Sequence, residues 1–161
     1  PATQQDFALW SGLMAGDAKR AIEKASSLLT RVTVEGSKGS YLLLKEDMKN
    51  VAFIDLDEEA PLRLLPKFDS MLLGHKDRAR IIQEKHKKRV FKPKVGDISA
   101  TVLADGRIVG TWKQKKTKKT LTITLELFEK IGKEDLKQAE REAKELSHYM
   151  GLTELKFVVT P

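Results

Sequence analysis

The stretch Leu62–Asp69, which reads LRLLPKFD, decides how the second part of this chain folds. Its three leucines are typical of a short buried strand. Pro66 ends that strand, because proline has no N–H to donate to a sheet. Asp69 then stands where the N-cap of a helix belongs. The stretch therefore predicts a buried strand, a sharp corner and a helix that begins near Met71.

Beyond this corner, the sequence predicts a helix from Asp77 to Lys88 and then a β-hairpin. The hairpin spans Thr101–Trp112, with Asp105-Gly106 at its tip, a pair that favours the tight turn between two strands. Residues 113–119, KQKKTKK, read as the next turn. The remaining expected elements are an alternating strand at 120–127, an amphipathic helix at 133–150 and a final strand at 155–159.

Before the corner, two short helices precede a second hairpin. Thr3 and Asp6 have the spacing of a capping box, and Asp17 is a suitable N-cap for a helix whose apolar stripe continues to Leu29. Strands are expected at 31–35 and 41–44. Two helices and a hairpin correspond to the back of a winged helix. Because its first helix is missing, we expect residues to precede Pro1.

These elements predict an α+β protein in two parts. Residues 1–56 form an incomplete winged helix, and residues 57–161 form an antiparallel β-barrel-like domain with two or three helices. Lys45–Glu59 is the expected connector between them. The aromatic side chains of Phe7, Trp10 and Trp112 are expected in the core, although Trp112 would also be able to stack on a base.

Net charge is +7, and its placement is more informative than its size. Residues 75–94 contain nine Lys/Arg and two acids, and residues 107–119 contain six Lys/Arg and no acid. Such blocks favour a polyanionic partner through counterion release, although lysine runs are also common on solvated surfaces. No apolar run approaches the length of a membrane span. Cysteine is absent, so the expected compartment is the reducing cytoplasm.

Three groups of basic residues are candidates for binding double-stranded DNA. The first lies on and after the Thr101–Trp112 hairpin, and its members are Arg107, Lys113, Lys115, Lys116, Lys118 and Lys119. The second lies on the expected basic helix, and its members are Arg78, Arg80, Lys87 and Lys88. The third, Lys19 and Arg20, lies on the helix that often enters the major groove in a winged helix, with Lys38 on the wing.

We predict no catalytic residue, metal site or cofactor in this chain. His75, His86 and His148 are widely spaced and have no cysteine to complete a zinc site. Asp69 and Asp77 would be able to form an acid–base pair, but helix capping and ion pairing with neighbouring bases are the favoured interpretation.

Three runs resemble one bacterial family in the same order. The first consists of PAT (1–3), DFA (6–8) and WSGL (10–13). The second consists of LRLLPKFD (62–69), LLG (72–74) and DR (77–78), and the third is VLADGRIVGTW (102–112). The family comprises tandem winged-helix proteins, among them DNA glycosylases that unhook interstrand crosslinks or remove bulky alkylpurines. The resemblance implies tandem winged helices, a β-barrel-like domain and a hairpin that helps to grip the duplex.

The same resemblance implies catalysis by a Gln–hydrophobic–Gln motif nearer the N-terminus of the family. The glutamines of this chain are Gln4, Gln5, Gln83, Gln114 and Gln138, and no two are separated by one residue. We therefore expect the DNA-binding part of a glycosylase-like repair protein without its catalytic motif. A non-enzymatic winged-helix DNA-binding or regulatory protein, and a protein-interaction domain, stay open as alternatives.

Overall fold

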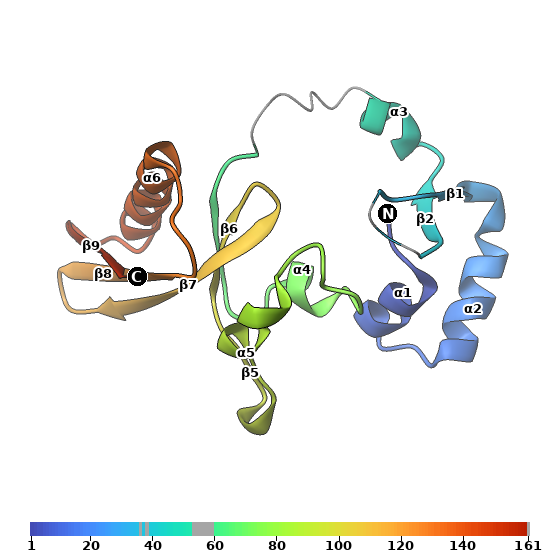
Figure 1. Ribbon diagram of the computed structural model, residues 1–161, viewed down its shortest axis with the longest axis horizontal. Helices are drawn as coiled ribbons and strands as arrows, with labels where there is room; N and C mark the ends of the chain where they lie inside the picture. The colour runs from blue at the N-terminus through green and yellow to red at the C-terminus, as the bar shows by residue number, and fades with distance from the viewer. Residues whose placement is uncertain (36, 38, 53–59, 161) are drawn as a thin grey trace. The chain divides into compact units, whose positions relative to one another are not determined.

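The computed structural model describes residues 1–161 except 36, 38, 53–59 and 161 (Figure 1). The described chain contains six α-helices and a five-stranded mixed sheet, so the fold is α+β as predicted. Two compact units are present. The first unit comprises residues 1–58 and 70–77, and the second comprises residues 59–69 and 78–161. The boundary between functional domains at residues 56 and 57 stays a prediction.

The helices of the first unit begin with α1 (Gln4–Ser11), which has the predicted capping box. The Asp6 N–H donates to Thr3 Oγ1 over 3.1 Å, and the Thr3 N–H donates to Asp6 Oδ2 over 2.8 Å. The next helix, α2 (Ala15–Lys24), begins two residues before the predicted N-cap, so Asp17 lies in its first turn. An acid in that turn still stabilises the helix through its dipole.

A short 3₁₀ turn, η1 (Ser26–Leu28), leads into the hairpin of the first unit. Strand β1 (Leu29–Val32) pairs antiparallel with β2 (Tyr41–Leu44), and β1 begins two residues before the predicted start. Ala2 exchanges two backbone hydrogen bonds with Leu42, of 3.0 and 2.8 Å, and so lengthens this small sheet. The remaining helices of the unit are α3 (Asp47–Ala52) and α4 (Ser70–Leu73). Of the expected connector, residues 53–59 lie outside the described residues.

The sheet of the second unit has the order β3-β6-β7-β8-β9. Its strands are β3 (Arg63–Leu65), β6 (Thr101–Ala104), β7 (Arg107–Lys116), β8 (Thr120–Leu127) and β9 (Glu154–Thr160). Strand β9 pairs parallel to β8, so the prediction of an antiparallel sheet is wrong at this edge. The helix α6 (Lys133–Tyr149) lies between these two strands in sequence and supplies the crossover that parallel pairing requires. No closed barrel is found among the described residues, where β3 and β9 are the two edges.

The main core lies between this sheet and α6. The inward side chains of β8 are Leu121, Ile123, Leu125 and Leu127, and those of α6 include Ala139 and Ala143. Their spacings of two and four residues are those of a strand and a helix, which explains why both elements were predicted correctly. At the β3 edge, α6 also contributes polar contacts: the Leu62 N–H donates to Gln138 Oε1 over 2.7 Å.

The β6–β7 hairpin confirms the predicted Asp-Gly turn. Asp105 and Gly106 have φ values of 44° and 70°, as a two-residue turn with both φ angles positive requires. The strand register then shifts between Val102 and Leu103. As a result, Val109 joins Trp112 in the main core, whereas the Ile108 N–H donates to the Ile81 carbonyl over 2.7 Å.

The predicted helix from Asp77 to Lys88 is wrong. In its place are turns, the 3₁₀ helix η2 (Glu84–His86) and the single helical turn α5 (Lys87–Val90). A small β-hairpin follows, formed by β4 (Phe91–Lys92) and β5 (Asp97–Ile98) around η3 (Pro93–Val95). The physical reason is tertiary: Ile81 and Ile82 are both buried, and the carbonyl of Ile81 accepts from β7 instead of from a helical turn.

Within this segment, His86 is a buried imidazole. Its ring stacks on Phe128 with centroids 4.6 Å apart, and its Nε2 has no hydrogen-bond partner within the described part of the chain. Burial, together with the nearby charges of Lys85 and Arg89, lowers the pKa of His86 below its ordinary value of 6.5. The folded protein therefore holds this histidine neutral at a pH where the unfolded chain is protonated.

We expect the protein to lose stability as pH falls below about 6.5, because the unfolded state then binds a proton that folded His86 does not. Urea unfolding measured between about pH 7.5 and pH 5 checks this. The variant His86→Phe keeps a ring that can stack on Phe128 and should flatten the slope. An equal slope in His86→Phe would contradict the assignment.

Candidate nucleic-acid interface

Strands β7 and β8 form a second, longer hairpin whose far end is basic, and we call it the lysine hairpin. Its exposed basic residues are Lys113, Lys115, Lys116, Lys118 and Lys119. Sequence reasoning placed all five in a turn, but β7 continues to Lys116 and the reversal occupies only residues 117–119. Hydrogen bonds between Thr117 and Thr120 close the end, including the Thr117 N–H to the Thr120 carbonyl at 2.9 Å.

Strand alternation distributes these lysines over both sides of the sheet. Lys113 and Lys115 pair with Thr124 and Thr122, whose side chains alternate with the core leucines and therefore point away from α6. Thr122 in turn pairs with Lys156 on β9. We call this the basic face: the surface opposite α6 that carries Lys113, Lys115 and Lys156.

Lys156 is a candidate that sequence reasoning missed. It is exposed, and the register Lys115–Thr122–Lys156 brings it into one row with the lysine hairpin. No local pattern identifies it, because its place depends on the parallel pairing of β9. The predicted final strand was correct, but its neighbour was not readable from the sequence.

Two acids, Glu126 and Glu154, limit the positive charge on this side of the sheet. Glu154 pairs with Thr120 and accepts from its hydroxyl over 2.7 Å. Arg89 donates to Glu126 Oε1 over 2.9 Å, and the Lys113 ammonium lies 3.9 Å from Oε2. The hydrogen bond from Arg89 is the main cause that holds the pKa of Glu126 below its ordinary value, against partial burial, and the charges of Arg89, Lys113 and Lys92 add to it. Arg89 also lies over the Phe128 ring, 4.3 Å from its centroid. The α5 segment is thereby tied to β8 next to Lys113.

The other predicted residues of the second unit are distributed more widely. Arg107 is exposed at the first residue of β7, about 30 Å along that strand from Lys116.

The residues predicted on the basic helix lie in turns and short helices. The Arg78 guanidinium lies 4.8 Å from the centroid of the Phe91 ring. Lys87 is ion-paired with Glu84 at 2.6 Å. Arg80 and Lys88 are exposed. The single basic helix expected to gather the residues at 78–88 does not form, so they make no continuous basic stripe.

The two basic residues predicted in the first unit, Lys19 and Arg20, are each paired within α2. Lys19 lies 3.9 Å from Glu23, and Arg20 contacts Asp17. This pairing leaves the helix little net charge to offer a phosphate backbone. Lys38, the predicted wing residue, lies outside the described residues.

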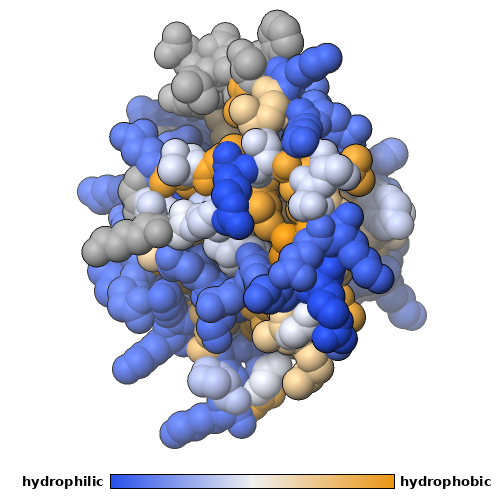
Figure 2. Space-filling model, turned by 90° about the vertical axis from the view of Figure 1, so that its right-hand side faces the viewer, coloured by the Kyte–Doolittle hydropathy of each residue, from blue (hydrophilic) through white to orange (hydrophobic). Residues whose placement is uncertain are grey.

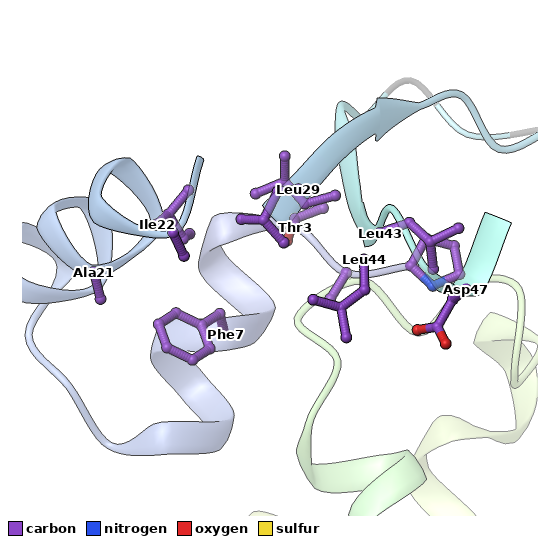
Figure 3. A pocket seen from close by; sticks show the side chains of 12 residues that line it. Thr3, Phe7, Ala21, Ile22, Leu29, Leu43, Leu44 and Asp47 are labelled. Carbon is purple, nitrogen blue, oxygen red and sulfur yellow. The ribbon is translucent and has the colours of Figure 1, made fainter. Parts of the chain in front are cut away.

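An apolar pocket of about 570 Å³ opens in the first unit between α1, α2 and the β1–β2 hairpin. Phe7, Ile22, Leu29 and Leu44 line it, and Figure 3 shows them around one space. Figure 2 shows hydrophobic surface between hydrophilic side chains on the side of α2. The apolar stripe of α2 that sequence reasoning expected in the core is thus largely open, with Ala18 as its buried residue.

No group of three or more His, Cys, Asp or Glu side chains lies close enough together in the described residues to hold a metal ion. Among the glutamines, Gln138 accepts a hydrogen bond from the backbone N–H of Leu62, just before β3, and so has a structural role. Across the part of the chain that the structure describes, no helix has both the length and the apolar character of a membrane span.

The described residues thus define an α+β protein with a helix–helix–hairpin unit and a mixed sheet that exposes lysines on one face. The chain belongs to the AlkZ-like DNA glycosylase family, whose model matches residues 1–149. The family resemblance found in the three sequence runs is therefore confirmed.

Two comparisons name a relative. The chain is 28% identical to the interstrand DNA cross-link repair glycosylase of Streptomyces sahachiroi, in an alignment of 161 positions that covers 96% of this chain. It is also similar to the solved structure of the Streptomyces sahachiroi DNA glycosylase AlkZ, with a TM-score of 0.78 and 28% identity over 99% of this chain. The chain spans only 40% of the length of the first and 42% of the second.

Proposed function

We propose that this chain supplies a duplex-binding surface to a DNA-repair glycosylase that acts on crosslinked or alkylated bases. The observation that carries the proposal is the lysine hairpin. Lys115, Lys116, Lys118 and Lys119 are exposed, and none of them has an ion pair among the described residues. Unpaired cations on a protruding hairpin can contact successive phosphates and release counterions.

The rest of the basic face supports a phosphate-backbone contact. Lys156 extends the row of Lys115 across β8, and Thr122 between them carries a hydroxyl group that can donate to a phosphate oxygen. A surface of this kind binds without reading base sequence. The exposed lysines, and not the ion-paired Lys19 and Arg20, are therefore the proposed anchor on DNA.

Residues 1–56 are proposed to be the helix–helix–hairpin part of a winged helix, with residues 57–161 as the second domain. The order α1, α2, β1, β2 supports this, as does the apolar pocket that opens between both helices and the hairpin. The reaction of the relatives is proposed to depend on residues other than those of this chain, because the chain has no Gln–x–Gln motif.

The salt dependence of duplex binding tests the proposal. Five or six phosphate contacts from the basic face and the hairpin end predict a log–log slope of about −5, so affinity should fall by about a thousandfold between 50 and 200 mM salt. Fluorescence anisotropy with a labelled 20-base-pair duplex of random sequence measures it. The same affinity is expected for unrelated sequences.

Two results would contradict this function. A flat salt response would exclude the phosphate-backbone contact. Strong preference for one operator over random duplex would instead favour the regulatory protein, in which α2 reads the sequence.

A further inference from the structure

Helices α1 and α4 are in contact within the first unit (Figure 1). A small mixed pocket is lined by residues of these two helices and of the segments beside them. Its volume is about 340 Å³, at the small end of the range for ligand pockets. The lining residues come from two segments more than fifty residues apart in sequence, and among them are Asp6, Phe7, Trp10, Ser70 and His75. The fold thus brings an indole, an imidazole, a hydroxyl and a carboxylate together.

Trp10 is the wall of this pocket, and it is 69% exposed. The prediction that it belongs to the core is therefore wrong, in contrast to the buried Trp112. The indole lies beside Gly74, whose Cβ position is 3.6 Å from the Trp10 ring, an ordinary van der Waals distance. The backbone of α4 is what requires a glycine here, because a Cβ would meet the Ser70 carbonyl oxygen at 2.9 Å. One of the largest aromatic side chains in the protein is thus held at the mouth of a pocket with much of its surface in water.

Asp6 and His75 supply the polar side of the pocket. Asp6 is buried, with Oδ1 accepting from the Lys76 N–H over 2.7 Å and Oδ2 accepting from the Thr3 N–H over 2.8 Å. Burial raises the pKa of Asp6, but these N–H donors and the nearby His75 outweigh it, so the pKa lies below its ordinary value and the group is ionised.

The Nδ1 of His75 lies 3.9 Å from Asp6 Oδ2, within ion-pair range when the imidazole is protonated. Within the described residues this is the one polar contact of that ring, so its second nitrogen is available to a ligand. The side chain of His75 is 30% exposed, which keeps it accessible from the pocket. A ligand that enters therefore meets both a stacking surface and a hydrogen-bonding edge.

We propose that this pocket binds a single unpaired nucleobase of DNA. An indole face stacks on any base, and hydrogen-bonding side chains at the edge of the base complete such sites. The buried negative charge of Asp6 disfavours a phosphate there, and its two oxygens already accept backbone N–H groups. The chemistry that fits is an uncharged aromatic heterocycle, stacked on Trp10 and hydrogen-bonded to His75. This inference rests on the proposed binding of the chain to DNA.

Trp10 fluorescence provides the test, with the 161-residue chain and two probes. One probe is a fully paired 20-base-pair duplex, and the other is the same duplex with one unpaired adenine. We expect the bulged duplex to quench the emission of the wild-type protein, and the paired duplex to leave it nearly unchanged. The variant Trp10→Phe should show no quenching, because buried Trp112 alone remains.

Affinity for the two probes gives a second measurement. Trp10→Ala is expected to weaken binding to the bulged duplex about tenfold, as loss of one base–aromatic stack does, and to leave paired-duplex affinity within about twofold. His75→Ala should weaken binding to the bulged duplex, and the quenching of Trp10 emission still measures that binding in this variant. Leu9→Ala is the matched control, since Leu9 is an exposed apolar residue of α1 outside the pocket.

The outcomes separate the two proposals. If neither duplex binds, the proposed function fails and this inference fails with it. If both bind and Trp10 emission does not respond to the bulge, the inference alone is overturned. Equal losses on both probes in Trp10→Ala would also overturn it, because Trp10 would then be a general duplex contact. Circular dichroism verifies that each variant is folded.

Discussion

Replacing Lys115, Lys116, Lys118 and Lys119 together by glutamate is expected to lower duplex affinity by at least about a thousandfold at 0.1 M salt. Each lost phosphate contact removes about 0.9 from the log–log salt slope, so the slope should flatten by about 3 to 4. The four acids also repel the phosphates that the lysines attracted. Titrations by anisotropy at several salt concentrations measure both the loss and the slope.

A control with the same change in net charge distinguishes location from total charge. Lys130, Lys133, Lys137 and Lys144 lie on α6 or just before it, on the side of the sheet opposite the basic face. Their replacement by glutamate should cost about tenfold or less, through long-range attraction that salt screens. Equal losses of duplex affinity in both quadruple variants would show that the lysine hairpin is not part of the interface. The hairpin lysines are exposed, so stability should change little.

Trp112→Ala is expected to destabilise the protein by about 3–5 kcal/mol, because it opens a cavity in the main core. The indole is 9% exposed, and its Nε1–H donates to the Leu65 carbonyl over 2.8 Å. That bond connects β7 to β3, the edge strand that contains the central leucines of the opening stretch. A loss of this size is a large part of the stability of a typical domain. The midpoint of urea unfolding, followed by circular dichroism, measures it.

The second tryptophan is the internal control for this prediction. Trp10→Ala removes the same side chain from an exposed position and should cost about 0.5 kcal/mol or less. Trp112→Phe keeps a ring in the core but leaves the Leu65 carbonyl without its donor, for an intermediate cost of about 1–3 kcal/mol. Similar costs for the two alanine variants would contradict the assignment of Trp112 to the core.

The two tryptophans also illustrate how far the sequence carries the prediction of a site. Both were expected in the core, although Trp112 was also a candidate for stacking on a base. Trp112 has that position because the β6–β7 hairpin turns it toward α6, a choice set by local strand alternation and the register shift. Trp10 is largely exposed on α1. The sequence did not reveal this, because an open helix face has the same sequence pattern as a covered one.

For the basic residues too, one part of the site was predicted from the sequence and another part was not. The charge blocks and the lysines of the hairpin were identified from the sequence, since charge is a property of each residue. Their arrangement was not: Lys113 faces away from α6, Lys19 and Arg20 are paired within their own helix, and Arg107 lies at the far end of β7. The positions of these side chains relative to one another depend on strand pairing between residues far apart in the sequence. Those positions set the number of phosphates that the surface can contact.

By itself, the sequence determined the features that arise from interactions over a few residues. The capping box at Thr3, the Asp105-Gly106 turn, the alternation of β8 and the stripe of α6 belong to this group, and the family resemblance followed from three ordered runs. Only the tertiary structure decided that β9 pairs parallel to β8, that Ile81 contacts β7 outside a helix, and that Lys156 joins Lys115. Such contacts join residues far apart in the chain, and several partners satisfy the same local pattern, so the packing of the whole unit selects among them.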